Sequence, residues 1–314
     1  MSAIDEIKAM VSLDDPFRDA PANLREIQLQ ALKERFAEKR KQIKIVDRRA
    51  TDAGIEEINS LDDVVPLLFT HTNYKSYPEA FVDKGQWKHL SLWLQTLTGE
   101  PAANVDVDGV QDVDDWVASQ AEAGNILFAS SGTSGKCSFL NQTVDDVELA
   151  KTAYVKSFRA QWGDIEPNQD RTAFIFFPPE GVHRLCLHNN NFFTNYVTSP
   201  GNCHFISDAP LKAGPNIRAG QLRRALAAGT ALPEEVAAFE EENAARGKKM
   251  QADLADFMDK IYQARNKPLA LGIMWPQAYQ LVQELRSRGV KDGSMHPDTV
   301  LCMGGGIKGV TLPD

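Results

Sequence analysis

Residues 125–142 read NILFASSGTSGKCSFLNQ: an apolar run, a loop of small residues, and a second run that alternates apolar and polar side chains. The apolar run at 125–129 predicts a short buried strand. The alternation in residues 138–143 predicts a second extended segment. Because an extended segment, and not a helical pattern, follows the loop, we expect the loop to join two strands as a hairpin.

The loop at 130–137, SSGTSGKC, has the composition of an anion-binding turn. Its two glycines allow positive φ and close approach of the backbone. Successive N–H groups in such a turn form a nest that suits an anion. The four hydroxyl groups add neutral donors, and Lys136 adds a mobile positive charge. The combination suits a polyphosphate, whereas a Ser/Gly-rich turn without a ligand is the alternative interpretation.

This loop differs from the Walker A loop, GxxxxGK[ST]. Ser130 stands where the first glycine of that motif belongs, and Cys137 replaces the hydroxyl residue that would hold magnesium. The segment after Lys136 also does not open a helix, so a P-loop NTPase is not indicated.

From residue 125 onward, short apolar runs alternate with helical patterns, which is typical of an α/β layered domain with largely parallel strand pairing. We expect strands at 125–129, 172–177, 203–206, 269–274 and 299–303, and helices at 144–162 and 277–288. The charged segment 233–262 predicts a solvated helical hairpin or excursion. Upstream, residues 22–43 and 77–97 have helical periodicity, with the second broken at Gly85. The predicted organisation is therefore an N-terminal helical region (1–122) followed by an α/β nucleotide-binding core (123–314).

Composition argues against several classes of protein. The chain of 314 residues has a formal net charge of −9, which argues against a general nucleic-acid binder. No apolar run reaches the ~20 residues of a membrane helix, and the acidic N-terminus lacks a signal-peptide layout, so a cytoplasmic location is expected. The four cysteines are far apart and predict reduced, mostly buried thiols with no metal site.

The run LFASSGTSGKCSFLNQT at 127–143 resembles the phosphate loop of the adenylate-forming enzymes, [ST]SG[ST][ST]GKP followed by a strand, with Cys137 in place of the usual proline. Two further stretches agree. INSLDDVVPLLFT at 58–70, with Lys75 after it, is similar to a segment of the phenylacetate-CoA ligase branch. LCMGGGIKG at 301–309 is similar to a segment of the acyl-protein synthetases of bacterial bioluminescence. The resemblance spans roughly residues 25–310.

The resemblance implies the layered sheets of the large N-terminal domain of these enzymes. It also implies ATP- and Mg²⁺-dependent activation of a small-molecule carboxylic acid to an acyl-adenylate. The acyl group would then pass to coenzyme A or to a protein residue. Lys136 would be the catalytic cation, offsetting charge on the departing pyrophosphate, and Gly304, Gly305 and Gly306 would border the adenine. The residues expected to hold the phosphates are Ser130, Ser131, Gly132, Thr133, Ser134, Gly135 and Lys136.

Other motifs of the resembled family fall outside the 314 residues. These are an aromatic-Gly-x-Thr-Glu motif with a magnesium ligand, a ribose-binding Asp, and a C-terminal domain with a catalytic Lys. The chain is therefore expected to be the N-terminal portion of a larger ligase, and a non-catalytic nucleotide-binding or scaffold fragment is the alternative. A second copy of the chain is also considered as a partner.

Three weaker candidates complete the sequence-based expectations. The glycines at 304–309 also fit GxGxxG, but no helix pattern follows them, so a Rossmann dinucleotide site is disfavoured. His183 follows a predicted strand and is a candidate for the acyl pocket, although a single histidine is more often structural. Phe192 and Phe193 could floor a hydrophobic site, with core packing as the favoured interpretation.

Overall fold

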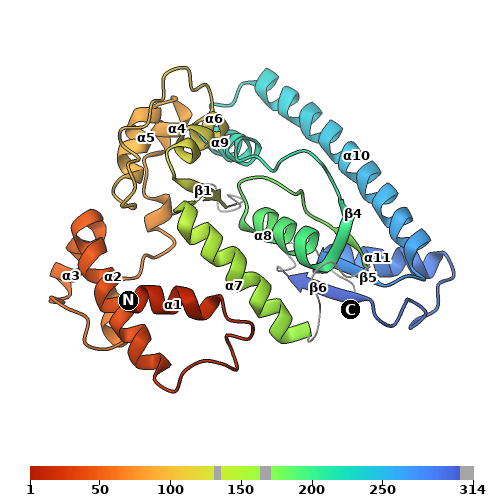
Figure 1. The fold of residues 1–314 in the computed structure, drawn as a ribbon. Helices are drawn as coiled ribbons and strands as arrows, with labels where there is room; N and C mark the ends of the chain where they lie inside the picture. The colour runs from red at the N-terminus through yellow and green to blue at the C-terminus, as the bar shows by residue number, and fades with distance from the viewer. Residues whose placement is uncertain (131–135, 163–170, 305–314) are drawn as a thin grey trace. The chain divides into compact units, whose positions relative to one another are not determined.

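The computed structural model describes residues 1–130, 136–162 and 171–304 (Figure 1). The chain divides into two compact units. The first comprises residues 1–161 and 212–224, and the second comprises residues 162–211 and 225–314. The functional boundary expected after residue 122 stays a prediction.

The first unit is mainly helical, with one two-stranded hairpin. Its helices are α1 (Ala3–Val11), α2 (Leu24–Gln42), α3 (Lys44–Asp52), η1 (Asp62–Leu67), η2 (Asn73–Lys75), α4 (Glu79–Asp83), α5 (Trp87–Leu94), α6 (Val113–Glu122), α7 (Val144–Trp162) and α9 (Gly214–Ala228). Helices α7 and α9 each have their C-terminal residues in the second unit. Its strands are β1 (Ile126–Ala129) and β2 (Phe139–Gln142), which pair antiparallel. The expected hairpin is therefore confirmed.

Local sequence signals account for several of these boundaries. Gly85 has a φ of +61°, a conformation that favours glycine, and it separates α4 from α5 as expected. Helix α7 begins after Thr143, whose Oγ1 accepts the Asp146 N–H (3.0 Å) while Asp146 accepts the Thr143 N–H (3.1 Å). This reciprocal pair is a capping box.

Residues 60–67 contain the 3₁₀-helix η1, and the Ser60 side chain does not cap it. The carboxylate of Asp63 instead accepts the Ser60 N–H at 2.8 Å, so the bond runs in the opposite direction. Pro66 lies inside the 3₁₀-helix η1. Pro66 is the fifth of the six residues of η1, so the helix lacks the bond that an N–H at this position would donate.

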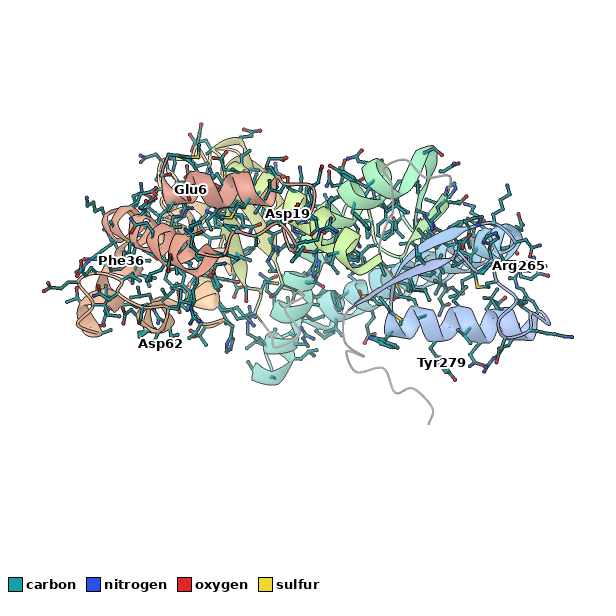
Figure 2. The ribbon with its side chains drawn as sticks, turned by 60° about the horizontal axis from the view of Figure 1, so that its bottom comes forward. Glu6, Asp19, Phe36, Asp62, Arg265 and Tyr279 are labelled. Carbon is teal, nitrogen blue, oxygen red and sulfur yellow. The ribbon has the colours of Figure 1, made fainter. Side chains whose placement is uncertain are left out.

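A small apolar cluster holds the N-terminal helices of the first unit together. Phe36 on α2, labelled in Figure 2, packs with Ala50, Ile58 and Leu67. Leu29 and Leu32 of α2 lie against the same cluster. The apolar stripe predicted for residues 22–43 therefore faces a buried surface of its own unit.

The second unit is built on a four-stranded parallel sheet. The strands are β3 (Arg171–Ile175), β4 (Thr198–Phe205), β5 (Leu269–Met274) and β6 (Val300–Gly304), in the order β4-β3-β5-β6. All three pairings are parallel. The helices are α8 (Arg184–Phe192), the π-helix η3 (Phe193–Val197), α10 (Pro233–Ala264) and α11 (Trp275–Ser287). The α/β class is confirmed, whereas the specific sheet arrangement of the adenylate-forming enzymes stays a prediction.

The segment 233–262, expected to form a solvated helical hairpin or excursion, is part of one continuous helix of 32 residues, α10. Gly247 lies in its interior and does not break it, because one glycine costs only about 1 kcal/mol relative to alanine. The surrounding alanine, glutamate, lysine and methionine residues favour the helix. Its C-terminal part is anchored by the buried side chains Phe257, Met258 and Ile261.

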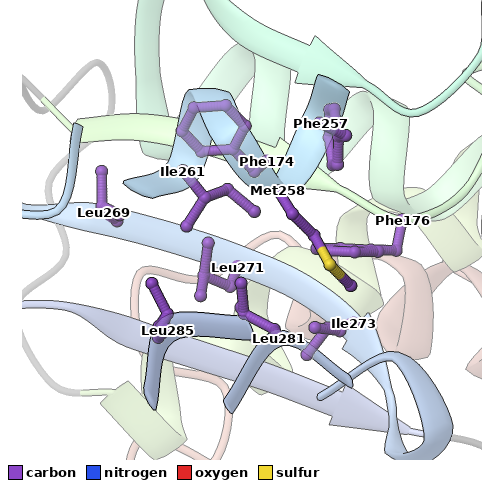
Figure 3. Packing of buried hydrophobic residues seen from close by; sticks show 10 residues of the cluster. All are labelled: Phe174, Phe176, Phe257, Met258, Ile261, Leu269, Leu271, Ile273, Leu281 and Leu285. Atoms are coloured by element: carbon purple, nitrogen blue, oxygen red, sulfur yellow. The ribbon is translucent and has the colours of Figure 1, made fainter. Parts of the chain in front are cut away.

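One face of the sheet carries the main core of the second unit (Figure 3). Alternate residues of β3 and β5 point to this face, and helices α10 and α11 cover it. The buried residues are Phe174, Phe176, Phe257, Met258, Ile261, Leu269, Leu271, Ile273, Leu281 and Leu285. Within the described residues, no helix has both the length and the apolar character needed to cross a bilayer.

The pairing of Leu271 with Leu301 allows a matched test of this core. The two leucines are register partners on β5 and β6, but Leu271 is 2% exposed and Leu301 is 53% exposed. We expect Leu271→Ala to lower the free energy of unfolding by about 2–5 kcal/mol, through lost burial and a residual cavity. Leu301→Ala is the control and should cost less than about 1 kcal/mol. Urea denaturation measures both, and equal losses would contradict the assignment of the core.

Candidate functional site

The base of the loop at 131–135 is closed by a pair of serines. Strands β1 and β2 pair in the register Ala129 to Phe139. One step further, the Ser130 N–H donates to the Ser138 carbonyl (3.0 Å), and the Ser138 N–H donates to Ser130 Oγ (2.8 Å). Ser130 therefore uses its backbone and its hydroxyl to hold the two ends of the loop together.

Lys136 is the first described residue after the loop, and its side chain is half-buried. Its ammonium group donates to the backbone carbonyl of Tyr77 and lies 4.2 Å from the centre of the Tyr77 ring. Burial lowers the pKa of Lys136 below its ordinary value, whereas the nearby carboxylates of Glu79 and Asp83 favour the charged form. The predicted catalytic cation is thus held beside the end of the loop.

An ion-pair cluster lies next to Lys136. Arg224 on α9 pairs with Glu79 (Nε–Oε2, 3.1 Å) and with Asp83 (Nη2–Oδ1, 3.1 Å). Gln221 also donates to Asp83 at 2.8 Å. Arg224, Glu79 and Asp83 line a cavity together with Lys136, and its volume of about 20 Å³ has room for roughly one water molecule. This side of Lys136 therefore does not admit a nucleotide.

Buried aromatic rings pack beside Tyr77. The Tyr77 ring centre lies 4.9 Å from that of Trp93 and 5.5 Å from that of Phe139. The ring centre of Trp116 lies 5.3 Å from that of Phe139. The Trp116 Nε1–H donates to Ser91 Oγ at 3.0 Å. Trp93 and Trp116 are both buried, and the N–H group of each ring is hydrogen-bonded, so both belong to the core.

Of the other residues predicted to bind the nucleotide, besides Ser130 and Lys136, the structure describes only Gly304. Ser131, Gly132, Thr133, Ser134, Gly135, Gly305 and Gly306 lie outside the described residues. Gly304 ends β6, pairs with Met274, and has open space where a Cβ would stand. Lys136 belongs to the first unit and Gly304 to the second. The adenine-bordering role of the glycines stays a prediction.

His183 has a local structural role. It is the N-cap of α8, where its Nδ1 accepts the Leu185 N–H at 3.2 Å. Its ring also lies 5.4 Å from that of Phe177. Capping is sufficient to account for a histidine at this position, and its role in an acyl pocket stays a prediction. Phe192 and Phe193 are buried, which agrees with the preferred interpretation as core.

The cysteines and carboxylates do not form a further site among the described residues. None of the four cysteines is in a disulfide, and two of them are fully buried. Burial raises the pKa of Cys186 and of Cys203 to about 11, so both are thiols at neutral pH. No group of three or more potential metal ligands occurs in the described ranges.

A cavity of about 870 Å³ lies elsewhere in the first unit, among α1, α2 and the start of α7. Its lining includes Ile4, Ile7 and Leu32. Charged residues of the lining pair across helices, Lys8 with Asp145 (3.7 Å) among them. Of the predicted site residues that the structure describes, none lines it.

Sequence reasoning missed Tyr77, Glu79, Asp83 and Arg224. The first three lie in one short stretch, YPEAFVD at 77–83, whose pattern indicates only a helix start. Arg224 lies about 140 residues further along the chain, and no local signal connects it to Asp83. A contact of this kind is visible only in three dimensions.

Scans against protein-family models, curated proteins and solved structures found no match for this chain. The resemblance to the adenylate-forming enzymes therefore remains an interpretation of the sequence. The functional argument rests on the residues and their geometry.

The closed base of the loop can be tested with Ser130→Ala. The substitution removes the acceptor of the Ser138 N–H, and we expect it to lower the free energy of unfolding by about 1 kcal/mol. Hydrogen exchange at the Ser138 amide should become faster. Ser119→Ala is the matched control, because its hydroxyl donates to Asp115 O on the exposed face of α6. Unchanged exchange at Ser138 would show that the serine pair does not close the loop.

Proposed function

We propose that this chain binds the phosphate groups of ATP at residues 130–136 and activates a carboxylic acid as an acyl-adenylate. One observation carries the proposal: the hairpin closed by Ser130 and Ser138 delivers the Lys136 ammonium to the end of a loop rich in glycine and hydroxyl residues. A loop of this composition suits a polyphosphate through backbone N–H groups, hydroxyl donors and one cation.

The proposed reaction has two steps. In the first, a carboxylate oxygen bonds to the α-phosphorus of ATP, the bond from that phosphorus to the oxygen bridging the β-phosphate breaks, and pyrophosphate leaves. In the second, a thiol adds to the acyl carbon, AMP leaves, and the thiol proton passes to solvent. Chemistry of this kind depends mainly on positioning and on stabilising developing charge.

Lys136 would supply part of that charge stabilisation. In the structure its amine donates to a neutral backbone carbonyl, that of Tyr77. A phosphate oxygen is a stronger acceptor because the bond is then charge-assisted at both ends. The four-carbon stem of lysine has enough rotational freedom for such an exchange of partners. Lys136 is thus suited to move from the carbonyl to a bound polyphosphate.

The metal, the acyl acceptor and the acid are the remaining parts of the proposed function. Mg²⁺ has no suitable donor set among the described residues, because Glu79 and Asp83 are already paired with Arg224, so we assign no step to the metal. The proposal includes two alternative acyl acceptors, coenzyme A and a protein residue. It also includes two alternative classes of substrate, aromatic acids and fatty acids.

Lys136→Ala tests the proposal directly. We expect ATP affinity, measured by isothermal titration calorimetry, to fall about 10–100-fold, the range for loss of one charged hydrogen bond. Lys84→Ala is the control, because Lys84 is exposed at the end of α4. The same proteins are then assayed for carboxylate-dependent exchange of labelled pyrophosphate into ATP, with panels of aromatic and fatty acids.

The outcomes separate the functional classes. ATP binding that depends on Lys136, together with exchange that requires a carboxylate, supports the ligase. ATP binding that depends on Lys136 without exchange for any acid supports a nucleotide-binding chain and overturns the catalytic part. Equal ATP affinity in the wild type and in Lys136→Ala overturns the phosphate site itself.

A further inference from the structure

Tyr77 contacts both residues that follow the loop, and it does so with three different groups. Its backbone carbonyl accepts the Lys136 ammonium, and its ring faces the same ammonium at 4.2 Å. Its hydroxyl donates to the Cys137 carbonyl at 2.9 Å. Two consecutive residues are therefore held by one side chain and its own backbone.

We propose that Tyr77 is a positioning residue that holds Lys136 and Cys137 in place, so that the Lys136 ammonium stays at the end of the phosphate loop. This inference rests on the proposed function of the loop, and it adds a residue that neither the sequence motif nor the resemblance indicates. Tyr77 acts through Lys136 and would not touch the reacting atoms.

The surroundings of Tyr77 make it a rigid support. It is 3% exposed, and its ring packs against Trp93 and Phe139. Trp93 is fixed in turn, because its Nε1–H donates to Ser76 Oγ at 2.9 Å. A buried phenol whose hydroxyl has a partner has few alternative orientations.

The backbone explains why the Tyr77 carbonyl can accept the ammonium. Tyr77 precedes Pro78, which is the N-cap of α4, so its carbonyl stands before the helix. The first intrahelical bonds of α4 go to Pro78, as in the bond from the Phe81 N–H to the Pro78 carbonyl. The helix therefore leaves the Tyr77 carbonyl available to a side-chain donor.

The charges around Lys136 leave its ammonium available for exchange. Glu79 and Asp83 favour the charged form of Lys136. Both carboxylates pair with Arg224, whose own positive charge disfavours the charged form of Lys136. Among the described residues, Lys136 has no direct ion pair with a carboxylate. A neutral carbonyl and an aromatic ring thus hold the ammonium, and a polyphosphate can compete with both.

Two substitutions separate the contributions of Tyr77. Tyr77→Phe keeps the ring and removes the hydroxyl bond to Cys137, and we expect ATP affinity to fall about 2–10-fold, as for one neutral hydrogen bond. Tyr77→Leu also removes the aromatic face beside the ammonium and should have the larger effect. Tyr74→Phe is the matched control, a half-buried tyrosine on the preceding turn that packs on Phe69, and it should change affinity less than about twofold.

A second measurement reports on Lys136 without any nucleotide. Competitive labelling with an amine-reactive reagent gives the pH midpoint of Lys136, which burial lowers in the wild type. Tyr77→Leu should open this site to water and raise the midpoint toward the ordinary lysine value of about 10.4. A purely structural role of Tyr77 would leave that midpoint unchanged in a protein whose circular dichroism is native.

The two measurements distinguish failure of this inference from failure of the proposed function. If wild type and Lys136→Ala bind ATP equally, the phosphate site is wrong, whereas the labelling midpoint still tests the hold of Tyr77 on Lys136. A native Tyr77→Phe protein with wild-type ATP affinity, or an unchanged midpoint in native Tyr77→Leu, overturns the positioning role. If Tyr77→Leu does not fold, Tyr77→Phe decides.

Discussion

The packing of Phe139 between the rings of Tyr77 and Trp116 determines where the β1–β2 hairpin lies in the first unit. Phe139 is fully buried, so a slip of the strand by one residue would turn it to the opposite face. Asn141, two residues further on the same strand, donates to Thr98 Oγ1 (2.8 Å) and to Asn125 Oδ1 (3.1 Å). Apolar and polar contacts therefore specify one register, and that register brings Ser130 opposite Ser138.

The charges around Lys136 bear on the proposal that this chain, whose net charge is −9, binds an anion at the hairpin. Glu79 and Asp83 lie close to Lys136 and would repel a phosphate if they were unpaired. Arg224 pairs with both carboxylates from a distant part of the sequence, which reduces the local negative charge. An anion site in an acidic protein needs such local neutralisation, because total charge says little about the field at one loop.

Elements with strong local signals were predictable from sequence. The apolar runs that form β1 and β5, the cap of α7 at Thr143 and the break at Gly85 all follow from short-range chemistry. Helical structure at 233–262 was predicted, but the sequence left open whether it is one helix; the structure has one helix, α10, whose C-terminal part packs against the sheet through Phe257 and its neighbours. For the candidate site, sequence predicted the loop between two strands, whereas Tyr77 and Arg224 depend on contacts far apart along the chain.

The order of the parallel sheet has a consequence for how the second unit folds. Strands β3 and β5 are neighbours in the sheet, yet paired residues such as Thr172 and Leu269 are about a hundred residues apart along the chain. The chain loses the entropy of closing that long loop before the strand pairing contributes favourable free energy. Topologies of this kind therefore fold slowly. During synthesis β3 and β4 emerge well before β5. The edge of β3 that pairs with β5 is therefore unpaired while α10 is synthesised. We therefore expect the refolding rate of the second unit to depend on chain topology more than on the strength of any one contact.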